Sequence, residues 1–370
     1  MLNLHRLILL FCVASIFAMG LAMIFNTASA EVLDHALARS THQALFKQII
    51  YALIGIAMAA GIWFLGYRRL LALSPALLAI FSFLLLIVLV PGIGKEVNGS
   101  RRWIGFAGFY FQPSEFIKYI VPAYFCHYMQ NKDGNDLSLK DFLQLIAKVS
   151  FPILLILVEP NNGTAGVIGL LVVVMCILTR IRFKYWALPL GCFLAVGLVF
   201  AYHLPYVTAR LNVYLHPELD LKGKGHQPYQ AKIATGSGQL FGRGPGNSLQ
   251  KLSYLPEAQN DYIAAIFAEE FGFLGIVGLI TLYMLIGYVG FSIASLAVDR
   301  GGFLFGGAIT FLICFQAFMN LGVVSGLLPS TGLNLPFFSQ GGTSLMANII
   351  GLGLLLNIAC THGDHKSYVS

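Results

Sequence analysis

The chain has 370 residues, of which 57% are hydrophobic and only 11% are charged. A soluble protein is roughly a quarter charged, so this chain cannot cover a water-facing surface of ordinary composition. The same composition excludes a disordered chain, a collagen-like repeat and a disulfide-rich secreted scaffold. We therefore expect an all-α fold, a polytopic transmembrane helical bundle.

The net charge of +7 comes from 23 Lys and Arg against 16 Asp and Glu. These basic residues lie scattered between apolar stretches and form no basic stripe, so the pattern gives no support for a nucleic-acid partner. Positive cytoplasmic loops and an anionic substrate explain them better. The 6 cysteines lie in or at the ends of apolar stretches without a CxxC pair, which is typical of small hydrophobic residues rather than metal ligands or disulfides.

The first thirty residues resemble a cleaved secretory signal, because Arg6 precedes an apolar run that ends in Ala28-Ser29-Ala30. The length of the apolar run distinguishes a cleaved signal from a transmembrane helix. The apolar run over 7–25 is longer than a signal core of roughly 7 to 15 residues and can cross a bilayer. We predict that it is the first transmembrane helix.

The apolar segments predict about ten spans by length and hydropathy. They lie near residues 7–25, 49–66, 71–91, 113–129, 143–158, 163–179, 185–203, 262–293, 303–323 and 343–361. An even number of spans, with the amino terminus inside, places both termini in the cytoplasm and most short basic loops beside them. The whole chain, 1–370, then forms one domain with a long extracytoplasmic loop over 204–260.

Acidic residues gather where this loop enters the next span. Pro256 suits a first helical turn, and Glu257 and Asp261 stand four residues apart. If helical, the two carboxylates share one face at the outer mouth of the membrane, where one can act as a base while the other tunes it or holds a cation. Complementation of the helix dipole with N-capping explains the same spacing equally well.

Two further acidic patterns lie in spans. Glu115 and Lys118 have the spacing of a helical ion pair, and charges at such a position usually face a bundle interior or a cavity, which favours a functional role over a structural one. Glu269 and Glu270 lie deeper in the span after Asp261, where a buried polar lock and a proton path are equally good interpretations.

Cations and glycines supply the remaining candidates. Arg102 and the loop cations Arg210, Lys232 and Arg243 could hold a diphosphate, although attraction to anionic lipid headgroups explains loop cations too. The glycines over 236–246 match a phosphate loop only weakly, because no strand precedes them and no GxxxxGKS/T pattern is present. Gly341-Gly342-Thr343-Ser344, preceded by Pro336 and Ser339, predicts a re-entrant turn that begins the last span, and Ser339 and Gly341 could line a ligand site there.

Taken together, the motifs resemble those of the SEDS family, the polytopic peptidoglycan glycosyltransferases of bacterial shape, elongation, division and sporulation. The matching residues are Arg102-Trp103, Gln112-Pro113-Ser114-Glu115-Phe116 with Lys118, Glu159-Pro160, Gly163-Thr164, Asn247 to Leu252, Tyr254 to Ala258, Gly332, Leu335-Pro336, Ser339 and Gly341-Gly342. The loop motifs resemble the division branch, FtsW, more closely than the elongation branch, RodA.

The resemblance implies polymerisation of lipid II, whose disaccharide-pentapeptide is carried on undecaprenyl diphosphate, at the outer face of the bacterial inner membrane. It places the catalytic residues at Asp261 and Glu257 and functionally sensitive positions at Trp103, Glu115 and Lys118. It also implies a class B penicillin-binding protein, a transpeptidase, and other division proteins as partners. We expect no tightly bound cofactor, with Mg²⁺ or Mn²⁺ near Asp261 and Glu257 as an option. A lipid II flippase is the alternative function.

The sequence departs from the family pattern near the proposed site. Gln259-Asn260 precede Asp261 where His-Thr is usual, Asn161 stands where Asp is usual, and Gln340 stands where Tyr is usual. These changes remove a titratable His and a carboxylate, so we expect altered rate, pH dependence or cation use.

Overall fold

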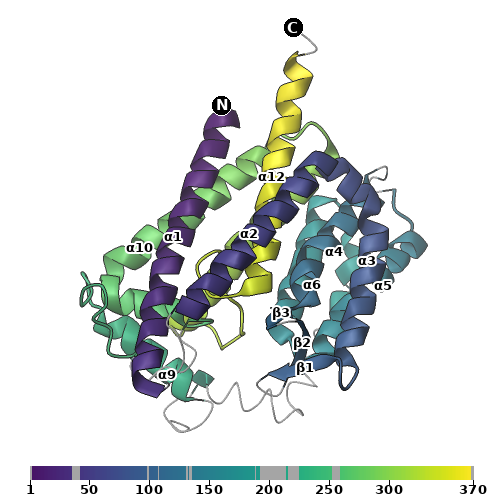
Figure 1. The fold of residues 1–370 in the computed structure, drawn as a ribbon. Helices are drawn as coiled ribbons and strands as arrows, with labels where there is room; N and C mark the ends of the chain where they lie inside the picture. The colour runs from purple at the N-terminus through teal and green to yellow at the C-terminus, as the bar shows by residue number, and fades with distance from the viewer. Residues whose placement is uncertain are drawn as a thin grey trace.

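The protein is a bundle of long helices with a small antiparallel sheet at the end opposite the two chain termini (Figure 1). The computed structural model describes residues 2–35, 42–97, 100–106, 108–130, 132, 136–187, 189–191, 214–215, 225–251 and 259–367. The elements are α1 (Leu2–His35), α2 (His42–Leu65), α3 (Tyr67–Leu89), β1 (Gly94–Val97), β2 (Ser100–Phe106), β3 (Phe109–Phe111), α4 (Pro113–Met129), α5 (Leu139–Val158), α6 (Asn162–Leu178), α9 (His226–Ser237), α10 (Ile263–Ser295), α11 (Arg300–Val324) and α12 (Gly342–Ser367). The predicted helical bundle is confirmed, and the sheet is a feature that the sequence analysis missed.

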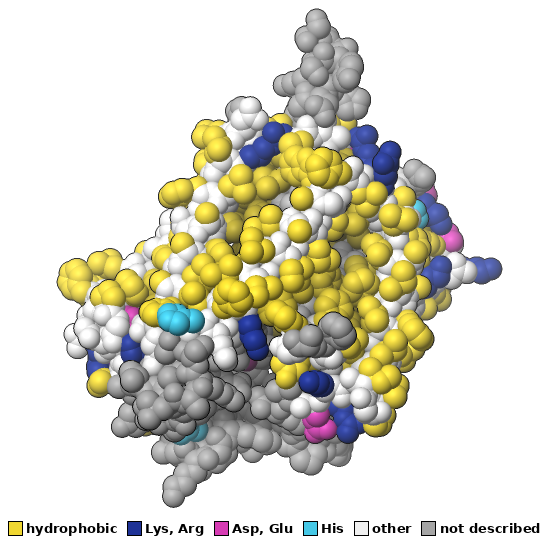
Figure 2. Space-filling model, viewed as in Figure 1, with side chains coloured by type: hydrophobic (Ala, Val, Ile, Leu, Met, Phe, Trp, Pro, Cys, Tyr) yellow, Lys and Arg dark blue, Asp and Glu magenta, His cyan; other side chains and the backbone are white. Residues whose placement is uncertain are grey.

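Seven of the described helices are long and apolar enough to cross a membrane, and α6 is a shorter apolar helix. Helix α1 includes the predicted first span, while the segment near 185–203 lies mostly outside the described residues. Hydrophobic side chains cover the flank of the bundle in Figure 2, and charged side chains lie mainly toward its ends. The chain is therefore a multi-pass membrane protein, and the number of ten spans stays a prediction.

Helices α11 and α12 form the centre of the bundle. In their most apolar stretches 67% and 78% of the residues are buried, compared with 17% in α2. Helix α2 packs along α12 on one side and exposes Leu53, Ile56 and Phe64 on the other. A helix that is apolar all round and buried belongs inside a bundle, whereas the exposed apolar face of α2 suits contact with lipid chains.

Helix α10 is longer than a membrane span requires. Its 33 residues correspond to about 50 Å, whereas roughly 20 residues cross the hydrocarbon core. Gly272 interrupts the helix with φ 66° and ψ −165°. The part after this break, 273–295, is long enough to cross the membrane alone, and the part before it, 263–271, lies at the end of the bundle that carries α9 and the sheet (Figure 1).

The opposite end of the bundle is held by Asp299, the N-cap residue of α11. Its carboxylate accepts hydrogen bonds from Gly302 N at 2.6 Å, from Tyr67 Oη at 2.8 Å and from Arg68 Nε at 2.8 Å. Burial alone would raise the pKa of Asp299, but these bonds outweigh burial and lower the pKa below its usual value. Asp299 therefore links α3 to the start of α11 as a carboxylate.

Replacing Asp299 with Ala is expected to lower the free energy of unfolding by about 1–2 kcal/mol at pH 7, the size of a lost N-cap. Because the folded-state pKa is lowered, the stabilisation is present above the unfolded pKa of about 3.9 and is lost as the pH falls through the folded value. Unfolding of the detergent-solubilised protein at pH 7 and pH 3 measures this. A wild-type advantage that does not shrink at pH 3 would contradict the assignment.

Candidate active site

Asp261 is half-buried and directly precedes Tyr262, the N-cap residue of α10. Its backbone carbonyl accepts a 2.8 Å hydrogen bond from Asn320 Nδ2 of α11, and the same amide donates to Leu333 O at 2.7 Å. The carboxylate lies beside Gly332, because a Cβ added to that glycine would stand 3.8 Å from Asp261 Oδ2. Asn320 thus joins the start of α10 to the turn that follows α11.

The segment before α12 folds back on the residues that precede Asp261. Gln340 N donates to Gln259 O at 3.0 Å. Gln48 of α2 holds the same segment, since its Nε2 donates to Ser339 O at 3.1 Å and its Oε1 accepts from Gly341 N at 3.3 Å. The chain turns at 336–338, whereas Gly342, Thr343 and Ser344 already belong to α12, so the turn predicted over 341–344 is wrong in position. Ser339 and Gly341 are fixed just before the helix. Contact of these two residues with substrate stays a prediction.

Arg102 and Trp103 lie in β2, the central strand of the sheet, with Lys95 of β1 opposite Trp103. The Arg102 guanidinium donates to Glu159 O at 3.0 Å and to Pro160 O, which directly follow α5. Arginine at a helix C-terminus satisfies open carbonyl groups and complements the helix dipole. Arg102 therefore ties the sheet to α5, a role that the sequence did not indicate, and its contact with a diphosphate stays a prediction.

The side chain of Glu159 is a buried acid at the same place. It is 1% exposed, and neither carboxylate oxygen has a hydrogen-bond partner among the described residues. Burial raises the pKa of Glu159 to about 8, and the charge of Arg102 lowers it by less. Glu159 is therefore mainly protonated at neutral pH.

Replacing Glu159 with Gln is expected to make stability less dependent on pH. The folded-state pKa of about 8 exceeds the unfolded value of about 4.3, so the folded state binds more protons between these values and the free energy of unfolding falls as the pH rises. The glutamine variant should gain stability relative to wild type between pH 5 and pH 8. Thermal unfolding in detergent at both pH values measures this gain, and an equal difference at both would contradict it.

Glu115 and Lys118 form the ion pair that their spacing predicted, with Glu115 Oε2 and Lys118 Nζ 2.7 Å apart in α4. The Lys118 side chain is 0% exposed. Its Nζ also donates to Gln316 Oε1 of α11 at 2.8 Å, and Gln316 Nε2 donates to Asn334 O at 2.8 Å. A buried polar chain therefore leads from α4 through α11 to the turn that faces Asp261. Contact of the pair with substrate stays a prediction.

The predicted loop cations occupy different places. Lys232 lies in α9 and packs on the end of α11, since a Cβ on Gly326 would stand 2.1 Å from Lys232 Cε. Arg243 Nη1 lies 3.6 Å from Glu269 Oε1 of α10. Arg210, together with the predicted catalytic Glu257, lies outside the described residues.

The glycine-rich segment of the loop packs against α10. A Cβ on Gly238 would stand 2.0 Å from Ala268 O, and one on Gly242 would stand 2.1 Å from Glu270 O. Gly242 also has φ 80°, a backbone conformation that favours glycine. Close approach to a helix therefore explains these glycines, and the weak match to a phosphate loop is not needed.

A divalent cation near Asp261 and Glu257 stays a prediction, because Glu257 lies outside the described residues. Among the described residues, no three His, Cys, Asp or Glu side chains gather as a metal site. Mg²⁺ is commonly held by one or two carboxylates together with substrate phosphates and water. Asp261, half-buried at the sheet end of the bundle, fits that arrangement with a diphosphate.

The sequence analysis missed the amide side chains that assemble this region. Gln48 lies in α2, and Gln316 and Asn320 lie in α11; each holds a backbone carbonyl of another segment. Polar residues inside membrane helices commonly hydrogen-bond across helices, so their presence in apolar runs was the available signal.

Comparison with known proteins identifies relatives along nearly the whole chain. The FtsW/RodA/SpoVE family, described as "Cell cycle protein", matches residues 6–363. The "Probable peptidoglycan glycosyltransferase FtsW" of Thioalkalivibrio sp. (strain K90mix) is 37% identical over 350 residues, 93% of this chain and 87% of that protein. "Stage V sporulation protein E" of Bacillus subtilis (strain 168) is 36% identical over 356 residues, 95% of this chain and 96% of that protein.

Solved structures of similar fold come from the same kind of protein as these relatives. A chain of the structure described as "Structural coordination of polymerization and crosslinking by a peptidoglycan synthase complex" matches with a TM-score of 0.75 and 28% identity, over 96% of this chain and 97% of that chain. The rod shape determining protein RodA of Thermus thermophilus matches with a TM-score of 0.69 and 28% identity, over 96% of both chains. Because the sequence and the fold both match over nearly their full length, this chain belongs to the FtsW/RodA/SpoVE family.

Proposed function

We propose that this chain is a peptidoglycan glycosyltransferase that polymerises lipid II at the outer face of the bacterial cytoplasmic membrane, for septal wall synthesis in cell division. The observation that carries the proposal is the half-buried Asp261 at the start of α10, at the end of the bundle opposite both termini. With both termini in the cytoplasm, this end faces outward. The names of the relatives support the class of reaction.

In this mechanism Asp261 is the general base. Its carboxylate accepts the proton of the acceptor sugar hydroxyl while that oxygen attacks the anomeric carbon of the growing glycan, and undecaprenyl diphosphate leaves with the bonding electron pair. Asn320 fixes the backbone of Asp261 during this step. A positioned base of this kind contributes roughly 10²- to 10⁴-fold to the rate.

Positive charge stabilises the departing diphosphate. Lys232 on α9 and Arg210 are the loop cations proposed for this role, because fixed cations act strongly where charge develops. The Arg243 guanidinium faces Glu269, so it contributes less. A divalent cation held by Asp261 and Glu257 would supply further positive charge to the diphosphate.

The proposed partner is a class B penicillin-binding protein, a transpeptidase that crosslinks the new glycan, acting with other division proteins. The likeness to a chain of a peptidoglycan synthase complex supports a two-protein assembly. The same chemistry in cell elongation is the alternative, and septal or lateral localisation of a tagged copy separates the two.

Incubation of the purified protein with lipid II and its cognate transpeptidase tests the proposal. We expect lipid-linked glycan polymers, detected by gel electrophoresis of labelled product. Transfer of labelled lipid II across proteoliposome membranes without polymer would instead identify a flippase and overturn the proposal.

A further inference from the structure

The loop before Asp261 is inserted into the break in α10. In a regular helix, the backbone groups on either side of Gly272 would bond to one another. Here they bond to residues 239–244. The bonds are Phe273 N to Gln239 O (2.9 Å), Leu274 N to Leu240 O (3.2 Å), Arg243 N to Glu269 O (2.9 Å) and Gly244 N to Glu270 O (3.0 Å). The loop therefore completes the backbone hydrogen bonding of the interrupted helix.

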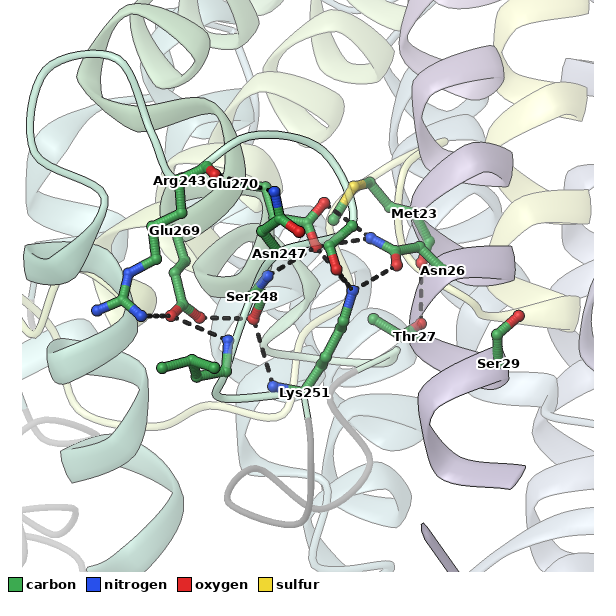
Figure 3. A network of polar contacts seen from close by, with 12 residues as sticks. Met23, Asn26, Thr27, Ser29, Arg243, Asn247, Ser248, Lys251, Glu269 and Glu270 are labelled. Carbon is green, nitrogen blue, oxygen red and sulfur yellow. Dashed lines mark hydrogen bonds and ion pairs between the residues drawn. The ribbon is translucent and has the colours of Figure 1, made fainter. Parts of the chain in front are cut away.

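The side chains of Glu269 and Glu270 bind the next part of the same loop (Figure 3). Glu269 accepts hydrogen bonds from Ser248 Oγ (2.5 Å), Leu249 N (3.2 Å) and Gln250 N (3.3 Å). Glu270 accepts from Ser248 N at 3.3 Å and from Lys251 Nζ at 3.1 Å. Both side chains are buried, and a buried carboxylate is costly unless such bonds satisfy it. These contacts are the ones that the polar-lock interpretation predicts.

Asn26 connects this lock to α1. Its Nδ2 lies 2.7 Å from each carboxylate oxygen of Glu270, and its Oδ1 accepts from Lys251 Nζ at 2.7 Å (Figure 3). Lys251 Nζ also donates to Gly246 O at 2.6 Å. One partly buried cluster, made of Asn26, Lys251 and the fully buried Glu270, therefore joins α1, the loop and α10.

We propose that Glu270, acting through Lys251 and Asn26, is a positioning residue for Asp261. The half-helix 263–271 has Asp261 just before its amino end and is separated by Gly272 from the membrane-crossing part, so the loop replaces helix continuity in fixing its place. Glu270 lies roughly 13 Å along the helix from Asp261 and touches no reacting atom. The proposal rests on the glycosyltransferase function proposed above. Positioning matters for that function, because a displacement of about 1 Å in a catalytic group can cost roughly 10²-fold in rate.

The test compares full-length wild type with Glu270→Gln, with Lys251→Met and with the double variant Glu270→Gln/Lys251→Met. For each single variant we expect kcat for lipid II polymerisation to fall about 10- to 100-fold, with KM unchanged, because the base is displaced while substrate contacts remain. Amide hydrogen exchange at 248–251 should quicken about tenfold or more, since Ser248 N loses its bond to the Glu270 carboxylate and its neighbours lose their fixed position.

The double variant distinguishes positioning through one cluster from general damage. Because Glu270 and Lys251 act as one unit, we expect kcat of the double variant to fall no further than kcat of the more impaired single variant. Losses of kcat that multiply in the double variant would overturn the proposal.

Asp141→Asn is the matched control, because Asp141 lies on α5, away from this cluster, and its 38% exposed carboxylate is paired with Lys132 Nζ at 3.4 Å. It should leave kcat and loop exchange unchanged. Wild-type kcat in Glu270→Gln with a faster-exchanging loop would overturn the positioning role. Absence of polymer from the wild type itself would count against the proposed function, and the exchange measurements would still show whether Glu270 anchors the loop.

Discussion

Replacing Asp261 with Asn is expected to reduce lipid II polymerisation by roughly 10²- to 10⁴-fold, the usual contribution of a positioned general base. Asparagine keeps the shape of the side chain but cannot accept the proton of the attacking hydroxyl. The backbone bond between Asp261 O and Asn320 Nδ2 does not depend on the carboxylate, so the fold at the start of α10 should remain. Polymer yield at matched enzyme concentration and initial rate measures the loss.

Two controls make this result specific. Asp141→Asn removes an exposed carboxylate of α5 and should polymerise at the wild-type rate. Thermal unfolding of Asp261→Asn should match that of wild type, which excludes loss of the fold as the cause. An Asp261→Asn protein that produces polymer at an undiminished rate would show that another group takes the proton.

Replacing Lys118 with Met is expected to lower the free energy of unfolding by about 3–5 kcal/mol, because it leaves a buried carboxylate without its counter-charge. Glu115 Oε2 stands 2.7 Å from Lys118 Nζ, and the lysine is fully buried. Methionine is close to the lysine stem in shape, so the loss reports the charge more than the packing. Gln316 Oε1 also loses its donor.

The double variant Glu115→Gln/Lys118→Met supplies the comparison. It removes both charges, so it should recover most of the stability that Lys118→Met loses. Denaturation of the detergent-solubilised proteins under one set of conditions measures all three differences. A double variant as unstable as the single one would show that packing, rather than an unpaired charge, causes the loss.

The helical bundle could be predicted from the sequence because the length of an apolar run is a local property. The sheet was missed although a signal is present: Asn98-Gly99 separates β1 from β2, and Asn-Gly is typical of two-residue hairpin turns. The charge of Arg102 favoured ligand binding over a strand as the interpretation of this segment. The break at Gly272 could not be predicted, because it depends on a loop that packs against α10 from elsewhere in the chain.

In the candidate site, contacts within one helix could be predicted from the sequence, and contacts between distant segments could not. The Glu115–Lys118 pair follows from the spacing of two residues on one helix. Asn320 and Gln48 act on segments distant in sequence, so their partners depend on tertiary packing. Asn161, which stands where the family usually has Asp, is buried with its Nδ2 3.4 Å from Ser114 Oγ, and a neutral amide there needs no counter-charge.

The contact between residues 239–244 and α10 constrains the sequence at a few positions only. Peptide groups make four of its bonds, so they form whatever side chains the loop bears. What the chain must provide is empty space, since a Cβ at Gly238, Gly242 or Gly272 would stand 2.0, 2.1 or 2.3 Å from a backbone atom. Substitutions at other positions of 239–244 can therefore accumulate during evolution while these residues stay bonded to α10. A single methyl group added at one of the three glycines would force the backbone of the loop away from the backbone of α10.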